Sequence, residues 1–229
     1  MTDLRVGVVG AGTMGSGIAQ VALLAGHALT LVDVQPEMIA RGRAAIAAGV
    51  QRLADKGQLS ADAVAAALAR LHTTSDLNDL AGAGLLIEAA PEKLALKQAL
   101  FGQLSVVCPA AVLASNTSSL RIGDIAAGTS DPTRVVGMHF FNPAPLMPLV
   151  EVIRGRSSAD ALALVSNAAR LGQNPVLAAD TPGFIVNRAH GRTTWRRCAS
   201  SARVWRRYLG STRRWRRSAF AWGRSACST

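Results

Sequence analysis

The sequence predicts an α/β fold built on a doubly wound, mainly parallel sheet. Short apolar runs alternate with helix-forming stretches along residues 4–188, and this alternation is typical of parallel strands joined by helical crossovers. The β-prone run at 4–9 is continuous, as expected of a strand that is buried on both faces. A glycine-rich turn and a helical stretch follow it directly, which adds a third observation in favour of this fold class.

The predicted elements follow one another along these 188 residues. Strands are expected at 4–9, 28–32, 84–89, 111–114, 134–139, 149–153 and 175–177, and helices at 13–24, 36–53, 61–71, 92–107 and 159–171. Gly57 and Ser60 mark a turn between the second and third helices, so these two form a helical hairpin inserted between strands. Pro182 suits a first-turn position and is expected to open a further helix.

Composition divides the chain into a domain at 1–188 and a basic region at 189–229. Of the 25 basic residues, eleven arginines lie in the basic region, which has no Asp, Glu or Lys, so the other 14 balance the 14 acidic residues of the domain. All four Trp and the single Tyr also lie in the basic region. The net charge of +11 therefore does not describe the domain, and a nucleic-acid partner is not expected for it.

Several other classes of protein do not fit the sequence. The apolar run at 6–9 is broken by Gly10 and is too short to span a membrane, so no membrane partner is expected. Only a few residues precede the first predicted strand, so no leader peptide is expected. Cys108, Cys198 and Cys227 do not make a disulfide framework. A cytoplasmic setting is therefore expected, and no metal site is predicted.

The turn after the first strand carries the pattern G-x-G-x-x-G, formed by Gly10, Ala11, Gly12, Thr13, Met14 and Gly15. The first glycine permits the tight turn, the second lets the backbone approach a pyrophosphate, and the third lets the helix pack close to the strand. The N-terminus of that helix offers free N–H groups to phosphates. In this strand–turn–helix context the pattern predicts a Rossmann-type, dinucleotide-binding fold, with a glycine turn of another α/β fold as the alternative.

An acidic residue, Asp33, ends the second predicted strand eighteen residues after Gly15. A carboxylate at this point accepts hydrogen bonds from the ribose hydroxyls and repels a 2′-phosphate. Val34, Gln35 and Pro36 follow it, so no Arg stands beside it to bind a 2′-phosphate. NAD is therefore the predicted cofactor, rather than NADP.

Four further runs lie beyond strand ends or at a helix start, where an α/β sheet places its ligand crevice. They are SNTSS at 115–119, GMHFFNP at 137–143, LVEVI at 149–153 and DTPGFIVNR at 180–188. Taken singly they are ambiguous, because a Ser/Asn/Thr cluster is often a turn and a strand-end His is often structural. Glu151 lies among apolar residues and needs a partner if it is buried, and His139 is the candidate partner.

Together, these runs resemble the 3-hydroxyacyl-CoA dehydrogenase family, which includes bacterial 3-hydroxybutyryl-CoA dehydrogenases, in order and approximate spacing over residues 4–188. The resemblance implies NAD-dependent oxidation of an (S)-3-hydroxyacyl-CoA, with His139 as general base and Glu151 orienting it. It also implies that Ser118 and Asn187 lie near the reacting hydroxyl. The implied cofactor contacts beyond the glycine turn and Asp33 are Glu92, Lys97, Asn116, Ser118 and Asn142, and the implied acyl-CoA contacts are Lys56, Ser118 and Asn142.

Two other functions remain open from the residues alone. A short-chain β-hydroxyacid dehydrogenase shares a similar glycine-rich start, but it uses a Lys base on a long helix. An NAD-binding relative that has lost its activity is the non-enzymatic alternative. The HFFNP and VEVI runs favour the CoA-dependent family.

The resemblance stops near residue 188. In the family a helical domain follows, which forms the homodimer interface and closes the acyl-CoA cleft, whereas 189–229 does not resemble it and that domain is expected to be missing. One hypothesis is a frameshift near Arg188, because one shifted reading of the back-translated basic region gives two stretches similar to the family's helical domain. On that hypothesis the chain binds NAD but turns over poorly. A disordered basic tail, and an arm that binds nucleic acid or anionic membranes, are the alternatives.

Overall fold

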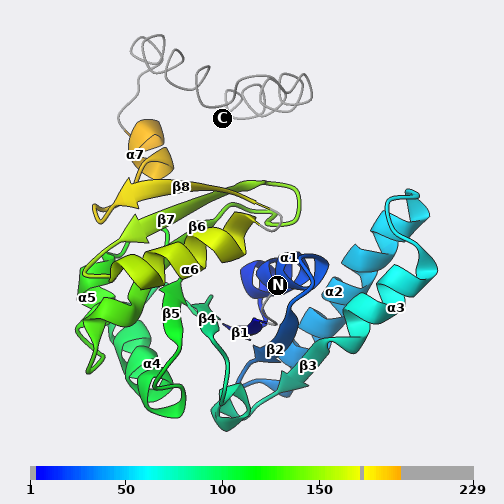
Figure 1. Ribbon diagram of the computed structural model, residues 1–229, viewed down its shortest axis with the longest axis horizontal. Coiled ribbons are helices and arrows are strands. Elements are labelled where there is room, and N and C mark those ends of the chain that lie inside the picture. Colours follow the sequence, from blue (N-terminus) through cyan, green and yellow to red (C-terminus); the bar gives the residue numbers. More distant parts are fainter. Residues whose placement is uncertain (1–3, 171–172, 192–229) are drawn as a thin grey trace. The chain divides into compact units, whose positions relative to one another are not determined.

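The computed structural model describes residues 4–170 and 173–191 (Figure 1). The chain divides into two units, Met1–Arg188 and Ala189–Thr229, and the fold described below is that of the first. The predictions for the basic region, including the frameshift, depend on 192–229 and lie outside the described residues.

The first unit alternates strands and helices, and the last helix, α7, begins in it and ends three residues after Arg188. The strands are β1 (Arg5–Val9), β2 (Ala28–Val32), β3 (Leu71–Thr74), β4 (Leu85–Glu88), β5 (Val112–Ser115), β6 (Val135–Phe140), β7 (Leu149–Arg154) and β8 (Asn174–Ala179). The α-helices are α1 (Thr13–Leu24), α2 (Pro36–Asp55), α3 (Ala61–Ala69), α4 (Leu94–Val107), α5 (Ile122–Ala126), α6 (Ala159–Arg170) and α7 (Val186–Gly191). Two single 3₁₀ turns, η1 (Leu77–Leu80) and η2 (Pro132–Arg134), precede β4 and β6.

The strands form one sheet in the order β3-β2-β1-β4-β5-β6-β7-β8, which confirms the doubly wound, mainly parallel architecture. The pairs from β3 to β6 are parallel, so the carboxyl ends of these strands lie along one edge of the sheet. By contrast, β7 runs antiparallel to β6. The link between them, 141–148, has no helix and is too short for a parallel crossover, so β7 turns back beside β6.

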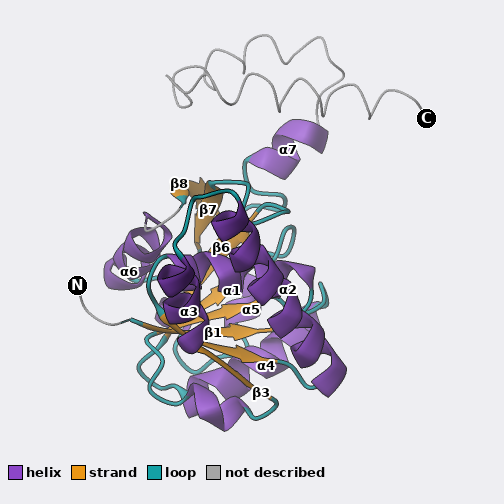
Figure 2. Cartoon of the chain, turned by 90° about the vertical axis from the view of Figure 1, so that its right-hand side faces the viewer, coloured by secondary structure: helices purple, strands orange, loops and turns teal. Residues whose placement is uncertain are grey.

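Helices cover both faces of the sheet (Figure 2). Successive side chains of β4 show the division, because Leu85 and Ile87 belong to the core that includes α1, α2, α3 and α6. Leu86, between them, belongs to the core that includes α4 and α5. This two-sided burial explains why the predicted strands are continuous apolar runs.

The helical hairpin predicted from the turn at Gly57 and Ser60 is present as α2 and α3. The Ser60 hydroxyl accepts a hydrogen bond from the backbone N–H of Ala63 at 3.1 Å and so caps α3. The prediction extended the second of these helices to residue 71, but α3 ends at Ala69 and β3 begins at Leu71. Edge strand β3 is partly exposed, which explains why its sequence lacks the apolar signal of the inner strands.

The helix expected to open at Pro182 begins instead at Val186. Gly183 and Phe184 have φ values of 75° and 45°, in the left-handed region, so a right-handed helix cannot run through them. The prediction was therefore wrong in its start, and residues 181–185 form a tight turn before α7. The short helix α5 was also missed, since its five residues give almost no periodic pattern.

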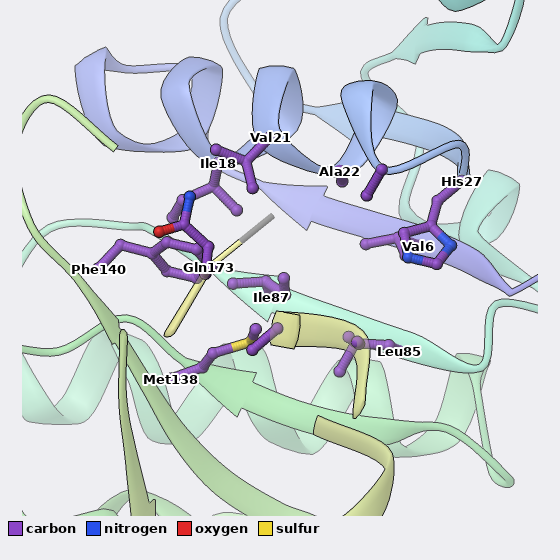
Figure 3. Close-up of a pocket in the computed structure, with 13 residues that line it drawn as sticks. Val6, Ile18, Val21, Ala22, His27, Leu85, Ile87, Met138, Phe140 and Gln173 are labelled. Atoms are coloured by element: carbon purple, nitrogen blue, oxygen red, sulfur yellow. The ribbon is translucent and has the colours of Figure 1, made fainter. Parts of the chain in front are cut away.

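A small apolar pocket lies in the core between α1 and strands β1, β4 and β6 (Figure 3). Its lining includes the apolar side chains of Ile18, Ile87, Met138 and Phe140 and the amide side chain of Gln173. This lining offers little for a charged dinucleotide, so the carboxyl edge of the sheet is the better candidate site. Among the helices of the described residues, none is long and apolar enough to cross a membrane.

A substitution of Gly15 by Ala should destabilise the fold. A Cβ added at Gly15 would lie 1.7 Å from the carbonyl oxygen of Gly10, so strand and helix would have to separate. We expect a loss of about 3 kcal/mol in the free energy of unfolding, measured by urea denaturation. Gly12→Ala is the matched control, because nothing lies within 4 Å of a Cβ there. Equal stability of the two variants would contradict this packing.

Candidate active site

The glycine turn between β1 and α1 leaves its backbone open at one point. Gly10 has a φ of 105°, which favours glycine, and its N–H donates to the carbonyl of Val32 at 2.7 Å. A Cβ at Gly10 would meet the backbone of Ala89, whereas one at Gly12 would meet nothing within 4 Å. The turn is therefore packed at its base and open at Gly12, which fits the close approach of a pyrophosphate.

Asp33 lies directly after β2, beside the glycine turn. Its carboxylate accepts hydrogen bonds from the backbone N–H of Ala11 at 2.7 Å and from that of Gln35 at 3.0 Å. The side chain is thus held at the carboxyl end of the strand, next to the turn. This placement fits a carboxylate that binds ribose hydroxyls and excludes a 2′-phosphate.

His139 and Glu151 face each other across β6 and β7, where they are paired in register. The Nδ1 atom of His139 lies 2.7 Å from Oε2 of Glu151. Both side chains are buried, with relative exposures of 6% for His139 and 1% for Glu151. The ring of His139 also contacts those of Phe141 and Phe184, at centroid distances of 4.6 and 5.7 Å. The imidazole is thus fixed on its edge by a carboxylate and against its sides by aromatic rings.

The second carboxylate oxygen of Glu151 is held by backbone. The N–H groups of Ile185 and Val186, at the start of α7, both donate to Oε1 at 2.9 Å. The tight turn at 181–185 places these two donors on the carboxylate, since its left-handed residues redirect the chain before the helix begins. Hydrogen bonds to a charged carboxylate offset the cost of burying it.

This arrangement determines which ring nitrogen of His139 can take part in chemistry. With Oε1 bonded to two N–H groups, Oε2 is the acceptor for a proton on Nδ1 of the imidazole. The neutral ring then keeps its lone pair on Nε2. A neutral imidazole oriented in this way can accept a proton, and the carboxylate stabilises the imidazolium that results.

Ser118 lies in a turn after β5, here called the Ser118 turn and defined as residues 115–119. One carboxylate oxygen of Glu92, Oε1, accepts hydrogen bonds from the hydroxyl of Thr117 at 2.6 Å and from the backbone N–H of Ser118 at 2.9 Å. It also accepts from the backbone and hydroxyl of Ser119 at 3.1 and 3.0 Å. Glu92 therefore organises the turn from one side.

These contacts account for the acidity of Glu92. Partial burial alone would raise its pKa, but the hydrogen bonds from Thr117, Ser118 and Ser119 and the charge of Lys97 lower the pKa to about 2. Glu92 is therefore ionised at neutral pH.

The DTPGFIVNR run supports the Ser118 turn from another side. Asn187 donates from Nδ2 to the carbonyl oxygen of Ser118 at 3.1 Å. Asp180 accepts from the backbone N–H groups of Ile122 and Gly123 at 2.7 and 2.8 Å, and so caps α5, which begins just after the turn. Ser118 and Asn187, predicted from distant runs, therefore lie together.

Asn116 links the Ser118 turn to the strand that carries His139. Its Oδ1 accepts a hydrogen bond from the backbone N–H of Phe140, the residue after His139, at 2.9 Å. The two halves of the candidate site are thus joined at the carboxyl ends of β5 and β6. Asn142 is exposed two residues after the end of β6.

Two other predicted residues are placed differently. The ammonium of Lys97 is 1% exposed and lies near three acceptors, Oε1 of Glu88 at 2.5 Å, the carbonyl of Ala90 at 3.1 Å and Oε2 of Glu92 at 3.4 Å. The first two contacts are hydrogen bonds and the third is an ion pair, so the ammonium of Lys97 is surrounded by groups of the protein itself. Lys56 follows α2 and is exposed, and no hydrogen bond or ion pair among the described residues joins it to the other predicted site residues.

Three groups near the site were not singled out from the sequence. They are the Glu88 carboxylate, the Asp180 carboxylate and the backbone N–H groups at the start of α7. Glu88 had a usable signal, because it ends an apolar strand just as Asp33 does. Asp180 opens a run already identified, but its contact with α5 joins residues 57 and 58 positions apart. No local pattern reveals such a contact.

Comparison with known proteins identifies the same family along most of the unit. A family model described as "3-hydroxyacyl-CoA dehydrogenase, NAD binding domain" matches residues 5–181. The chain is 46% identical over 186 residues to the 3-hydroxyadipyl-CoA dehydrogenase of Escherichia coli, covering 80% of this chain and 39% of that protein. It is 44% identical over 187 residues to the 3-hydroxybutyryl-CoA dehydrogenase of Bradyrhizobium diazoefficiens, covering 80% of this chain and 64% of that protein.

Solved structures give the same result. The (S)-3-hydroxybutyryl-CoA dehydrogenase PaaH1 of Ralstonia eutropha superposes with a TM-score of 0.79 at 40% identity, covering 82% of this chain and 67% of the other. The FadB2 protein of M. tuberculosis has a TM-score of 0.79 at 43% identity, covering 82% of this chain and 68% of the other. The chain thus spans between about two fifths and about two thirds of the lengths of these four proteins.

Replacing Glu92 by Gln should lower stability in a pH-dependent way. The folded-state pKa of Glu92, about 2, lies below the ordinary glutamate value of 4.5. The ionised carboxylate therefore adds stability above pH 4.5, and this contribution is lost as the pH falls toward 2. After discounting for the solvent exposure of Glu92, we expect the free energy of unfolding of the variant to be about 1 kcal/mol lower than that of the wild type at neutral pH. This difference should become smaller by about pH 3. Urea unfolding across this range measures it. Exposed Glu37→Gln is the control, and a Glu92→Gln deficit that persists unchanged into acid would contradict the expectation.

Proposed function

The chain belongs to the 3-hydroxyacyl-CoA dehydrogenase family, and we propose that it catalyses the NAD-dependent oxidation of an (S)-3-hydroxyacyl-CoA to the 3-oxoacyl-CoA. The observation that carries this proposal is the buried His139–Glu151 pair, with its Nδ1–Oε2 distance of 2.7 Å, at the carboxyl edge of a dinucleotide-binding sheet. Oxidation of a secondary alcohol needs a base for the hydroxyl proton. An imidazole whose Nε2 lone pair is kept available supplies one.

In the proposed mechanism the residues of this chain accept and return the proton of the C3 hydroxyl. Nε2 of His139 takes the proton from the C3 hydroxyl as the C3–O bond becomes a carbonyl. Glu151 stabilises the imidazolium, and its own charge is stabilised by the N–H groups of Ile185 and Val186. In the reverse reaction the imidazolium returns the proton. NAD, when bound, supplies the acceptor for the C3 hydride.

Ser118 and Asn187 are proposed to position the substrate oxygen. Both belong to one hydrogen-bonded unit, through the bond from Asn187 Nδ2 to the Ser118 carbonyl. Hydroxyl and amide donors held rigidly beside a reacting oxygen orient it and stabilise developing charge. The link from Asn116 to Phe140 keeps this unit in register with His139.

The cofactor assignment is supported by the shape of the glycine turn. The open backbone at Gly12 and the carboxylate of Asp33 would hold the pyrophosphate and the adenosine ribose of NAD. Glu92, Asn142 and exposed Lys56 are proposed to contribute at the cofactor or acyl-CoA site. We also propose a cytoplasmic setting, supported by the free thiol of Cys108, and the absence from this chain of the helical domain that forms the homodimer in the family.

The function is tested by following NADH formation with (S)-3-hydroxybutyryl-CoA. The full chain is assayed beside a version in which the shifted reading frame after Arg188 is restored, because we propose that 189–229 is out of frame. Turnover by the restored version supports the function, and turnover by both would show that the residues after 188 are not needed. If neither forms NADH although both bind NAD, the proposed reaction is wrong for this substrate.

Replacing Glu151 by Gln should abolish most of the activity through the imidazole tautomer. The N–H groups of Ile185 and Val186 would hold the amide oxygen of Gln, which leaves its NH₂ group facing Nδ1 of His139. The ring would then carry its proton on Nε2 and could not act as a base. We expect kcat to fall by about 10²-fold or more while NAD affinity stays within about twofold. A variant that keeps wild-type kcat would contradict the role of Glu151.

A further inference from the structure

A buried ion pair lies beneath the Ser118 turn. Glu88 is the last residue of β4 and Lys97 lies in the first turn of α4, and each is 1% exposed. Their charged atoms are 2.5 Å apart. Removing two charges from water is costly, and a buried pair is often no better for stability than an apolar pair of the same size. A contribution to stability therefore does not explain why this buried ion pair is present.

The two carboxylates near Lys97 both form hydrogen bonds with the Ser118 turn. Oε2 of Glu88 accepts a hydrogen bond from the Ser115 hydroxyl at 2.6 Å, and that hydroxyl oxygen accepts the N–H of Thr117 at 3.2 Å. Glu92 is bonded through Oε1 to residues 117–119 and lies 3.4 Å from Lys97 through Oε2. Lys97 therefore bridges a carboxylate that holds the start of the turn and one that holds its end.

We propose that Glu88 and Lys97 are positioning residues that set the conformation of the Ser118 turn through Ser115 and Glu92. The role in catalysis rests on the proposed function, because it matters only if Ser118 orients the substrate. The positive charge of Lys97 attracts both carboxylates and offsets the repulsion between them. Without it they repel each other, Glu92 loses its anchor, and the N–H groups of Ser118 and Ser119 lose their acceptor.

The charge on Lys97 is tested with Lys97→Met, which keeps the length of the side chain. Amide hydrogen exchange is measured for Ser118 and Ser119, whose N–H groups donate to Glu92, and for β2 as a remote reference. We expect exchange in the turn to become about tenfold faster or more while that of β2 changes much less. Lys93→Met, at the exposed N-cap of the same helix, is the matched control and should leave both unchanged.

The activity readout separates positioning from cofactor contact. With 3-hydroxybutyryl-CoA in the active form of the protein, Lys97→Met should lower kcat by about tenfold or more and leave the dissociation constant of NAD within about twofold. In a Ser118→Ala background the same substitution should have little further effect on kcat, because the two act as one unit. Additive losses in this cycle would overturn the proposal.

Other results of these experiments also test the positioning role of Lys97. Equally faster exchange in the turn and in β2 would show a general structural role and overturn the proposal. Weaker NAD binding with an unchanged turn would show that Lys97 contacts the cofactor instead. If Lys97→Met does not fold, Glu88→Gln combined with Lys97→Met removes the charge of both partners, and the same local exchange result is required. If no variant oxidises the substrate, the proposed function fails, but the exchange result still settles the positioning of the turn.

Discussion

The buried carboxylate of Glu151 is the group on which the candidate site depends. It is 1% exposed, and its two oxygens serve different partners, His139 on one side and the N–H groups of Ile185 and Val186 on the other. A buried charge of this kind is tolerated only while its hydrogen bonds are complete. The strand pairing of β6 with β7, the left-handed turn before α7 and the orientation of the imidazole are therefore coupled. A change in any one of them would leave either the carboxylate or the imidazole without its partner.

The second half of the site, the Ser118 turn, likewise depends on the hydrogen bonds of one carboxylate, that of Glu92. Glu92 gathers the donors of the Ser118 turn on one oxygen and faces buried Lys97 with the other. Asn187, at the start of α7, donates a hydrogen bond to the same turn. The residue before it, Val186, donates its backbone N–H to Glu151. The segment from Asp180 to Asn187 therefore touches both halves. Its conformation relates the base to the groups proposed to orient the substrate, and Asn116 provides a direct link between the strands.

Much of this arrangement could be predicted from the sequence, because short local patterns of residues carry the signals for the fold class and for the His139–Glu151 pair. The glycine turn, Asp33 and the apolar strand runs fix the fold class, and Glu151 among apolar residues called for a partner. The antiparallel course of β7 and the delayed start of α7 depend on a short link and on left-handed backbone at Gly183 and Phe184, which residue types alone do not specify. The burial of Lys97 was missed for a similar reason. The family resemblance implied a cofactor contact for Lys97, and only the packing of α4 against β4 shows that Glu88 lies beside its ammonium.

The most direct test of this account is the tautomer of His139 in the neutral imidazole, observed by nitrogen NMR of ring-labelled protein. A spectrum of His139→Gln assigns the signal among the other histidines. The account predicts a protonated Nδ1, donating to Glu151, and an Nε2 that carries the lone pair and is available as the base. A proton found on Nε2, with Nδ1 unprotonated, would contradict it, because Glu151 would then have no proton to accept and His139 no lone pair for the substrate.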